Sequence, residues 1–410
     1  MPRPIADVPA GLLLLLTGLL ALQPLSTDLY LASLPALRGH FQASVSAVQL
    51  TLSAFLAGFA LSQLVAGPLS DRFGRRPVAI AGCTLFTAAS LAGVLAPSLG
   101  VLIAARVLQA IGVCCTVVCA RAIVRDLYEA EAGARVLSRA LMWMGVAPIA
   151  GPVAGGLLQA TFGWRANFGL LAAAGALVLA AAWHTLRETN RHRNPAATDA
   201  ATLARNYARI AASRRFWAYA LPVTGSYSAL FCFISTSSFV LIGIFGIPAR
   251  QFGFVYALVT TGYMLGAMAV RRAVGRFGLV GSIRLGASVA LAAAACLAAL
   301  ALADVRSPWA VVVPMFGVVA AHGFIQPCCQ IGAIDPFPRQ AGAAAALLGF
   351  VMLAVSASAG WAVGALHDGG TRPLALGVAS SAALCALAAW ALLRRDASAP
   401  GQAGTAREAA

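Results

Sequence analysis

Long apolar runs of about 20 residues, nearly free of charge, constrain the fold of this chain more than any other feature. Two of them, residues 10–25 and 101–120, approach or reach the length that a helix needs to cross a bilayer. Of the 410 residues, 60% are apolar and only 10% are charged. A soluble domain of this size could not bury so much apolar surface. We therefore expect an all-α integral membrane protein.

The apolar pattern predicts twelve transmembrane helices of about 20 residues each. They lie near 10–31, 45–66, 78–96, 99–120, 136–159, 166–186, 216–240, 252–270, 281–303, 309–332, 342–366 and 373–393. The longest polar stretch separates the sixth from the seventh and holds a candidate amphipathic helix through Leu203, Tyr207 and Ile210. The expected organisation is an N-terminal six-helix bundle (1–186), a cytoplasmic linker (187–215), a C-terminal six-helix bundle (216–393) and a disordered cytoplasmic tail (394–410).

All 29 basic residues are arginines, and they alternate between the two sides of the predicted membrane. Twenty-three lie on the side of the N-terminus and five on the other, namely Arg38, Arg165, Arg250, Arg306 and Arg372. The net charge of +16 could suggest nucleic-acid binding, but the arginines fall in short segments between apolar spans and form no single patch. The positive-inside rule explains this distribution instead and predicts that both termini are cytoplasmic. We therefore do not expect nucleic acid as a partner.

The first span has a second interpretation, because Arg3 followed by an apolar run is also typical of a secretory signal peptide. No small-residue cleavage site follows the run, and the apolar segment continues to Tyr30. We therefore favour a permanent first helix.

The segment from Gly67 to Pro77 concentrates four charges, on Asp71, Arg72, Arg75 and Arg76, between two apolar spans. We expect a turn at the water interface, with Gly67 and Gly74 permitting close helix approach and a tight reversal. An orientation signal needs arginine but no carboxylate, so Asp71 suggests a latch to the neighbouring bundle. The triplet Arg72-Phe73-Gly74 recurs at 276–278, which suggests that two similar halves face each other.

Two charges are embedded in predicted spans. Asp28 lies about three residues from the outer end of the first span, and Arg106 lies about seven from the outer end of the fourth. At about 1.5 Å per residue, both fall in the outer third of the bilayer, so they could meet. Burying one such charge alone costs at least ~2.5 kcal/mol, which favours mutual proximity or a water-filled cavity. The pair could couple protons to cargo or be a static structural ion pair.

Other polar candidates are sparse. His322 and Gln326, one helical turn apart, could contact substrate or hydrogen bond between helices. Among aromatic residues that could line a cavity, Tyr30 is favoured because it neighbours Asp28; the others are Phe55, Phe59, Trp143, Tyr227, Phe231, Phe233 and Tyr263. The chain has no nucleotide-binding P-loop and no CxxC or Cys/His ligand cluster, so we predict no cofactor, no metal and no ATP-driven step. An intramembrane enzyme would need a polar catalytic cluster that this sequence lacks.

Three motifs resemble the major facilitator superfamily of secondary transporters. The spacing G-x-L-x-D-R-x-G-R-R from Gly67 to Arg76 resembles the loop between its second and third helices. Arg106-Val-Leu-Gln109-Ala-Ile-Gly112 is similar to its R-x-x-Q-G-x-G motif, with Ala110 replacing a glycine. Gly151-Pro152-Val-Ala-Gly155-Gly156 is similar to the GPxxGG motif of the drug/proton antiporters. Pro148 and Pro152 also predict a kinked, pliable helix there.

Further segments resemble the bicyclomycin and chloramphenicol resistance (Bcr/CflA) branch, namely 26–31, 125–128, 163–165 and, more loosely, 216–266. The tenth span departs from the branch, with Pro327-Cys328-Cys329 where Pro-Asn is expected. The resemblance implies two pseudo-symmetric bundles in the bacterial inner membrane and a monomer that exports small, largely apolar drugs in exchange for protons. It implies gating roles for Gly67, Asp71, Arg72, Gly74, Arg75, Arg76, Gln109, Gly112, Gly151, Pro152, Gly155 and Gly156.

Two other functions stay open at this point. One is export of an endogenous metabolite such as an amino acid derivative, with drug resistance incidental. The other is a membrane sensor that transports nothing and therefore shows no gradient-driven flux.

Overall fold

The computed structural model describes residues 9–393, and within them the regular elements are helices, without a β-strand. Before the linker lie α1 (Ala10–Asp28), η1 (Leu31–Ser33), α2 (Leu34–Phe41), α3 (Val45–Phe73), α4 (Arg75–Val94), α5 (Leu99–Leu127), α6 (Ala130–Met144), α7 (Ala147–Phe162) and α8 (Trp164–Thr185). The linker holds η2 (Pro195–Thr198) and α9 (Ala200–Ala211). After it come α10 (Arg214–Ser238), η3 (Phe239–Ile244), α11 (Ala249–Leu302), α12 (Trp309–Ile334), η4 (Pro338–Gln340), α13 (Ala341–Ala365) and α14 (Arg372–Ala391). The predicted tail lies outside the described residues.

In this part of the chain, 11 helical stretches are long and apolar enough to cross a membrane. They amount to twelve crossings, because α11 has 54 residues and contains a non-helical residue, Gly278, with φ 71° and ψ −179°. At about 1.5 Å per residue, α11 would be far longer than the roughly 30 Å hydrocarbon core. The eighth and ninth predicted spans are therefore its two segments.

The repeated Arg-Phe-Gly triplet adopts a similar geometry in both halves. Gly74 has φ 104° and ψ 160°, close to the backbone of Gly278. In each triplet the guanidinium lies over the neighbouring ring, at 5.2 Å for Arg72 and Phe73 and at 5.4 Å for Arg276 and Phe277. Positive φ is accessible to glycine without a Cβ clash, so the triplet ends one helix and starts the next in both places.

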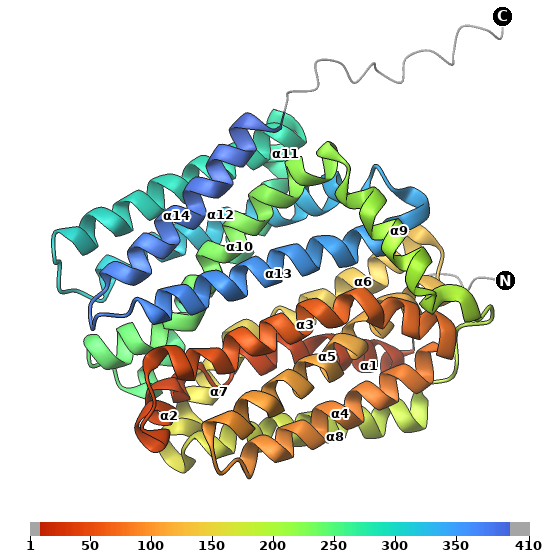
Figure 1. The fold of residues 1–410 in the computed structure, drawn as a ribbon, viewed down its shortest axis with the longest axis horizontal. Coiled ribbons are helices and arrows are strands. Elements are labelled where there is room, and N and C mark those ends of the chain that lie inside the picture. The colour runs from red at the N-terminus through yellow and green to blue at the C-terminus, as the bar shows by residue number, and fades with distance from the viewer. Residues whose placement is uncertain (1–8, 394–410) are drawn as a thin grey trace, which may run out of the picture.

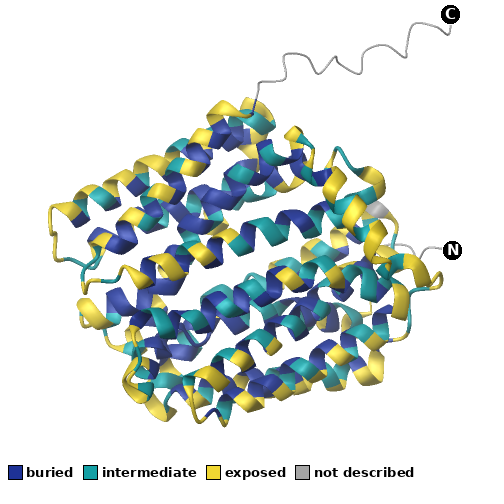
Figure 2. Cartoon of the chain, viewed as in Figure 1, coloured by how far each residue is buried: buried dark blue, intermediate teal, exposed yellow. Residues whose placement is uncertain are grey.

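The two sets of helices lie as separate groups that meet along α3 and α13, side by side in the middle of Figure 1. The most buried helices are α3 and α10, with 67% and 72% of their apolar windows inside, against 33% for α8 and α11. Exposed residues run along the outer helices (Figure 2), and many are large and apolar, such as Leu177 and Leu387. Such a surface suits contact with lipid.

Helix α9 lies at one end of the molecule and α2 at the other (Figure 1). We call the end with Gly74 and α9 the arginine-rich end, and the end with α2 and η3 the opposite end. Two local expectations need correction or refinement. Gly67 does not lie in a turn, because α3 remains helical to Phe73 and Gly74 alone reverses the chain. The fifth span divides into α6, which ends at Met144, and α7, which starts at Ala147 with Pro148 in its first turn.

Candidate functional site

Asp28 is the last residue of α1, and only 6% of its surface is exposed. Its carboxyl interacts with the hydroxyls of Thr27 and of Tyr256, which lies on α11 in the second half. Tyr227 of α10 lies nearby. An added Cβ on Gly151 of α7 would lie 3.6 Å from the Asp28 Cβ. The embedded acid therefore sits where both halves meet.

Arg106 is fully buried inside the first half. Its guanidinium lies between two rings, 4.4 Å from the Tyr30 centroid and 4.2 Å from that of Phe55. Its Nη1 donates to Gln109 Oε1 at 2.8 Å, and its Nε donates to the carbonyl of Thr51 at 3.3 Å. Its Nη2 has no hydrogen-bond partner. Aromatic faces and neutral oxygens therefore surround this cation.

The expected contact between Asp28 and Arg106 is not formed in this conformation. The ion pairs of residues 9–393 do not include either residue. The rings of Tyr30 and Phe55 occupy both faces of the guanidinium, while Asp28 turns to Tyr256. Counting residues along each helix predicted a similar depth in the membrane for the two groups. It could not predict the direction in which each side chain points.

Tyr30 belongs to the arginine cluster. Its hydroxyl hydrogen bonds with Thr51 Oγ1 at 2.9 Å, and its side chain is fully buried. Gln109 extends the hydrogen-bond network of Arg106, because its Nε2 donates to Ser90 Oγ at 2.7 Å. Gly112 packs α5 against α4, since an added Cβ would lie 2.6 Å from the Gly82 carbonyl oxygen.

The glycines of α7 allow three different close approaches. A Cβ on Gly155 would overlap the Leu29 carbonyl of the same half. A Cβ on Gly156 would overlap the Ala249 carbonyl at the start of α11, in the other half. From the other side, Gly253 of α11 lies against the Pro152 carbonyl. This segment therefore holds α7 against both α1 and the second half at the opposite end.

A second contact closes the same end. Gln49 of α3 donates from Nε2 to the carbonyl of Ser235 at 2.9 Å and to Thr236 Oγ1 at 3.2 Å, both on α10. Gly364 of α13 leaves room for the Gln49 amide. The helices η1 and α2 also touch α10, α11 and η3 there. The halves are thus joined at the opposite end by hydrogen bonds and by backbone packing.

His322 lies in the second half at the middle of α12. Its Nδ1 is 3.0 Å from Ser226 Oγ, and its ring centroid lies 5.5 Å from that of Tyr227 and 5.9 Å from that of Tyr263. The Tyr263 hydroxyl donates to Gln326 Oε1 at 2.7 Å. Tyr227 therefore links the surroundings of His322 to those of Asp28, whereas Tyr30 lies with Arg106.

The charged loop at the arginine-rich end is tied to its own half and to the linker. Asp71 Oδ1 lies 2.5 Å from Arg75 Nη1, and Arg75 Nε lies 2.9 Å from Asp126 Oδ2. Glu188 accepts hydrogen bonds from the backbone N–H groups of Arg75 and Arg76, capping α4. The expected latch from Asp71 to the second bundle is not formed here, because Arg75 on the next helix is nearer.

The linker helix α9 forms as expected and contacts both halves. The Tyr207 hydroxyl donates to the Leu64 carbonyl of α3 at 2.7 Å. Gln340 of η4 donates to Asn206 Oδ1 at 3.0 Å. Burial raises the pKa of the Tyr207 phenol above its ordinary value, so the hydroxyl remains a donor at neutral pH.

A cavity of about 680 Å³ lies at the arginine-rich end. Its walls come from α3, α5, the linker and the start of α13. Its lining includes the carboxylate of Asp71 and four arginines, namely Arg75, Arg121, Arg125 and Arg339. Both halves thus border an opening at this end, while the opposite end is closed.

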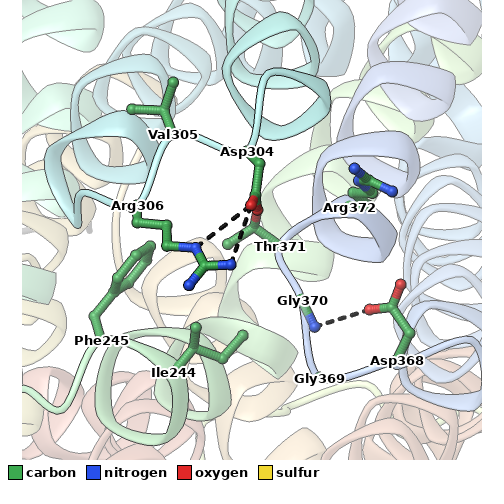
Figure 3. A pocket seen from close by; sticks show the side chains of 10 residues that line it. All are labelled: Ile244, Phe245, Asp304, Val305, Arg306, Asp368, Gly369, Gly370, Thr371 and Arg372. Atoms are coloured by element: carbon green, nitrogen blue, oxygen red, sulfur yellow. Dashed lines mark hydrogen bonds and ion pairs between the residues drawn. The ribbon is translucent and has the colours of Figure 1, made fainter.

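A second pocket of about 550 Å³ lies among loops of the second half at the opposite end (Figure 3). Arg306 Nη2 lies 3.2 Å from Asp304 Oδ2, and the Gly370 N–H donates to Asp368. Its lining contains none of the predicted site residues. The loops already hold these carboxylates, so this pocket is not part of the candidate site.

Within the described residues, no group of three or more His, Cys, Asp and Glu could hold a metal ion. All nine cysteines are free thiols. Sequence reasoning did not identify Gln49, Glu188 or Tyr256. None of the three belongs to a recognised motif. The sequence signals were a polar side chain in an apolar span, for Gln49 and Tyr256, and an acid just past a helix end, for Glu188.

Comparison with known proteins gives consistent results. A family model described as Major Facilitator Superfamily matches residues 16–361. The chain is 27% identical over 384 residues to a bicyclomycin resistance protein homolog of Haemophilus influenzae, covering 93% of this chain and 96% of that protein. It is 30% identical over 344 residues to multidrug resistance protein D of Escherichia coli K12, covering 83% and 84%.

Solved structures show the same fold at low identity. The D-xylose-proton symporter superposes with a TM-score of 0.73 at 17% identity, covering 93% of this chain and 98% of that one. A bacterial homolog of the human lysosomal transporter Spinster, in an inward-facing and unoccupied conformation, gives 0.72 at 18% identity, covering 96% and 100%.

Proposed function

The chain belongs to the Major Facilitator Superfamily, and we propose that it is a proton-coupled antiporter that exports small, largely apolar drugs from the cytoplasm. The observation that carries the proposal is Asp28, a carboxyl buried at the junction of the halves with no cation paired to it among the described residues. The names of the relatives support the cargo class, since two of them are resistance proteins. The coupling ion would be the proton and the cargo a small molecule.

Alternating access is supported by the asymmetry of the two ends. The opposite end is closed by Gln49, by the α7 glycines and by Tyr256. The arginine-rich end holds the cavity. With the arginine-rich end placed in the cytoplasm of a bacterial inner membrane by the positive-inside rule, this conformation is inward-open.

Proton entry supplies enough free energy for the task. One proton that moves down ~100 mV and one pH unit releases about 3.7 kcal/mol, which corresponds to a several-hundred-fold gradient of a neutral drug. We assign proton binding to Asp28. Arg106 is the second residue of the coupling site, and we call the rings of Tyr30 and Phe55 around it the aromatic cage. We assign cargo contact to Tyr227, Tyr263, His322 and Gln326, because they form one cluster and Tyr227 joins it to Asp28, and we leave Tyr30 to the Arg106 cluster.

Drug transport into sealed inverted vesicles tests this proposal. Asp28→Asn keeps the size and hydrogen-bonding capacity of the side chain but removes the titratable proton. We expect it to abolish drug accumulation against a gradient, while downhill exchange of neutral drug persists. Ser228→Ala, which removes a buried hydroxyl pair with Ser356 inside the second half, serves as the control.

Other outcomes point to other functions. An Asp28→Asn protein that still builds a proton-driven gradient would remove Asp28 from the coupling step. Proton-driven flux of an amino acid derivative but of no drug would favour a metabolite exporter. Absence of gradient-driven flux for every compound would favour a sensor.

A further inference from the structure

From the second half, the uncharged hydroxyl of Tyr256 hydrogen bonds with the Asp28 carboxyl. Tyr256 is itself buried, and its ring stacks on Phe233 of α10 at 5.8 Å and 8°. This contact crosses from the first half to the second at the closed end. It therefore exists only while the halves are together there.

The surroundings of Asp28 contain no compensating charge. Of the helices packed around it, α11 contributes Tyr256, α10 contributes Tyr227 and α7 contributes Gly151. Arg106 of α5 is held by Tyr30, Phe55 and Gln109 instead. An unpaired carboxylate in such a place is costly, whereas a neutral carboxylic acid with one hydroxyl partner is not.

We propose that Tyr256 is a positioning residue that holds the Asp28 carboxyl against the second half in the closed state, so that the opposite end closes over the neutral acid and opens when Asp28 ionises. Closure removes Asp28 from water and places it against the Tyr256 hydroxyl. Ionisation makes the dry site unfavourable, and separation of the halves returns the carboxylate to water. The Tyr256 hydroxyl favours closure in either protonation state.

This mechanism gives antiport its order of steps. A proton bound from outside would permit closure at the opposite end and so return the empty carrier to the inward-open state. Release of that proton to the cytoplasm when drug binds would leave Asp28 ionised and so favour reopening to the outside. The inference rests on the proton coupling proposed above and adds the second-half residue that receives the Asp28 carboxyl when the opposite end closes.

Hydrogen–deuterium exchange measured by mass spectrometry tests the proposal on the full-length protein in lipid nanodiscs without drug. Segments 147–162 and 249–257 report on the opposite end, and 200–211 reports on the arginine-rich end. Variants are compared with the unaltered protein at each pH from 5.5 to 8.5, so intrinsic exchange rates cancel. The variants are Asp28→Asn, Tyr256→Phe and the control Ser228→Ala.

We expect the opposite end of the unaltered protein to lose protection as the pH rises. Asp28→Asn should stay protected at every pH. Tyr256→Phe keeps the ring and its stacking but loses one hydrogen bond, so its closed state should be populated about fivefold less and the pH midpoint of opening should move lower. Ser228→Ala should follow the unaltered protein.

A pH response that persists in Asp28→Asn, a Tyr256→Phe midpoint equal to that of the unaltered protein, or an equal shift in Ser228→Ala would each overturn the inference. The vesicle experiment separates this failure from failure of the proposed function. Uphill export by Asp28→Asn would refute both. Loss of uphill export in Asp28→Asn together with an unchanged Tyr256→Phe midpoint would refute only the role of Tyr256.

Discussion

Three glycines of α7 offer a graded test of how this helix works. Substitution by alanine adds the same methyl group at each position, but the surroundings differ. At Gly151 the methyl would meet Asp28 Cβ at an ordinary 3.6 Å. At Gly155 it would overlap a backbone carbonyl of the same half, and at Gly156 a backbone carbonyl of the other half.

The expected magnitudes follow from two opposing effects. Alanine in place of glycine inside a helix gains up to about 1 kcal/mol of propensity. Overpacking against a rigid backbone costs typically 1–3 kcal/mol. Gly151→Ala should therefore be neutral or slightly stabilising, and Gly155→Ala should lower the free energy of unfolding by about 1–2 kcal/mol.

Gly156→Ala should act differently, because its overlap disappears when the halves separate at the opposite end. A cost of 1–3 kcal/mol confined to the closed state shifts the balance of open and closed forms by about 5- to 150-fold. We expect near-normal thermal stability, increased deuterium exchange in α7, and slow drug export. Gly151→Ala is the matched control on the same helix.

Thermal unfolding in detergent and drug export by cells, measured on the same three variants, distinguish these cases. Equal damage from Gly151→Ala and Gly155→Ala would refute the steric reasoning, since only the methyl group at position 155 would overlap a backbone atom. A Gly156→Ala protein that is as unstable as Gly155→Ala would show that the α7–α11 contact is a permanent part of the fold and does not open during transport.

The fold was predictable because hydropathy and glycine chemistry act locally. Apolar runs predicted the crossings, and the repeated Arg-Phe-Gly triplet predicted two similar halves, in which Gly74 and Gly278 reverse the chain with similar backbone geometry. The extra turns of α3 beyond residue 66 were missed, since a helix that leaves the membrane continues in water until a residue such as Gly74 stops it.

The candidate site was less predictable because it depends on direction as well as depth. Counting residues along a helix gives the height of Asp28 and Arg106, but a side chain turns by about 100° per residue around the axis. The partner of Asp28, Tyr256, is 228 positions away in the sequence and belongs to no motif that was used. Such a contact follows from how the two halves meet, which a single sequence does not specify.

Three further substitutions probe the arginine-rich end and the buried cation. Asp71→Asn leaves Arg75 its second carboxylate, that of Asp126 at 2.9 Å, so we expect drug binding to persist and turnover to slow; loss of binding would contradict this. Tyr207→Phe removes the donor to Leu64 and should weaken protection of α9 by about 0.5–1.5 kcal/mol. Because the folded pKa of Tyr207 is raised, this contribution should be present at neutral pH and be lost only as the pH rises past its ordinary value of 10.0. Arg106→Lys keeps the charge but not the planar guanidinium that lies between two rings and reaches Gln109. A desolvated cation–π contact is worth about 2 kcal/mol. The lysine protein should therefore unfold at a lower temperature than the unaltered protein. Arg106→Gln has no charge to bury and should not show this decrease. If lysine is tolerated as well as arginine, the aromatic cage contributes nothing specific, and the charge alone explains why an arginine stands at this position.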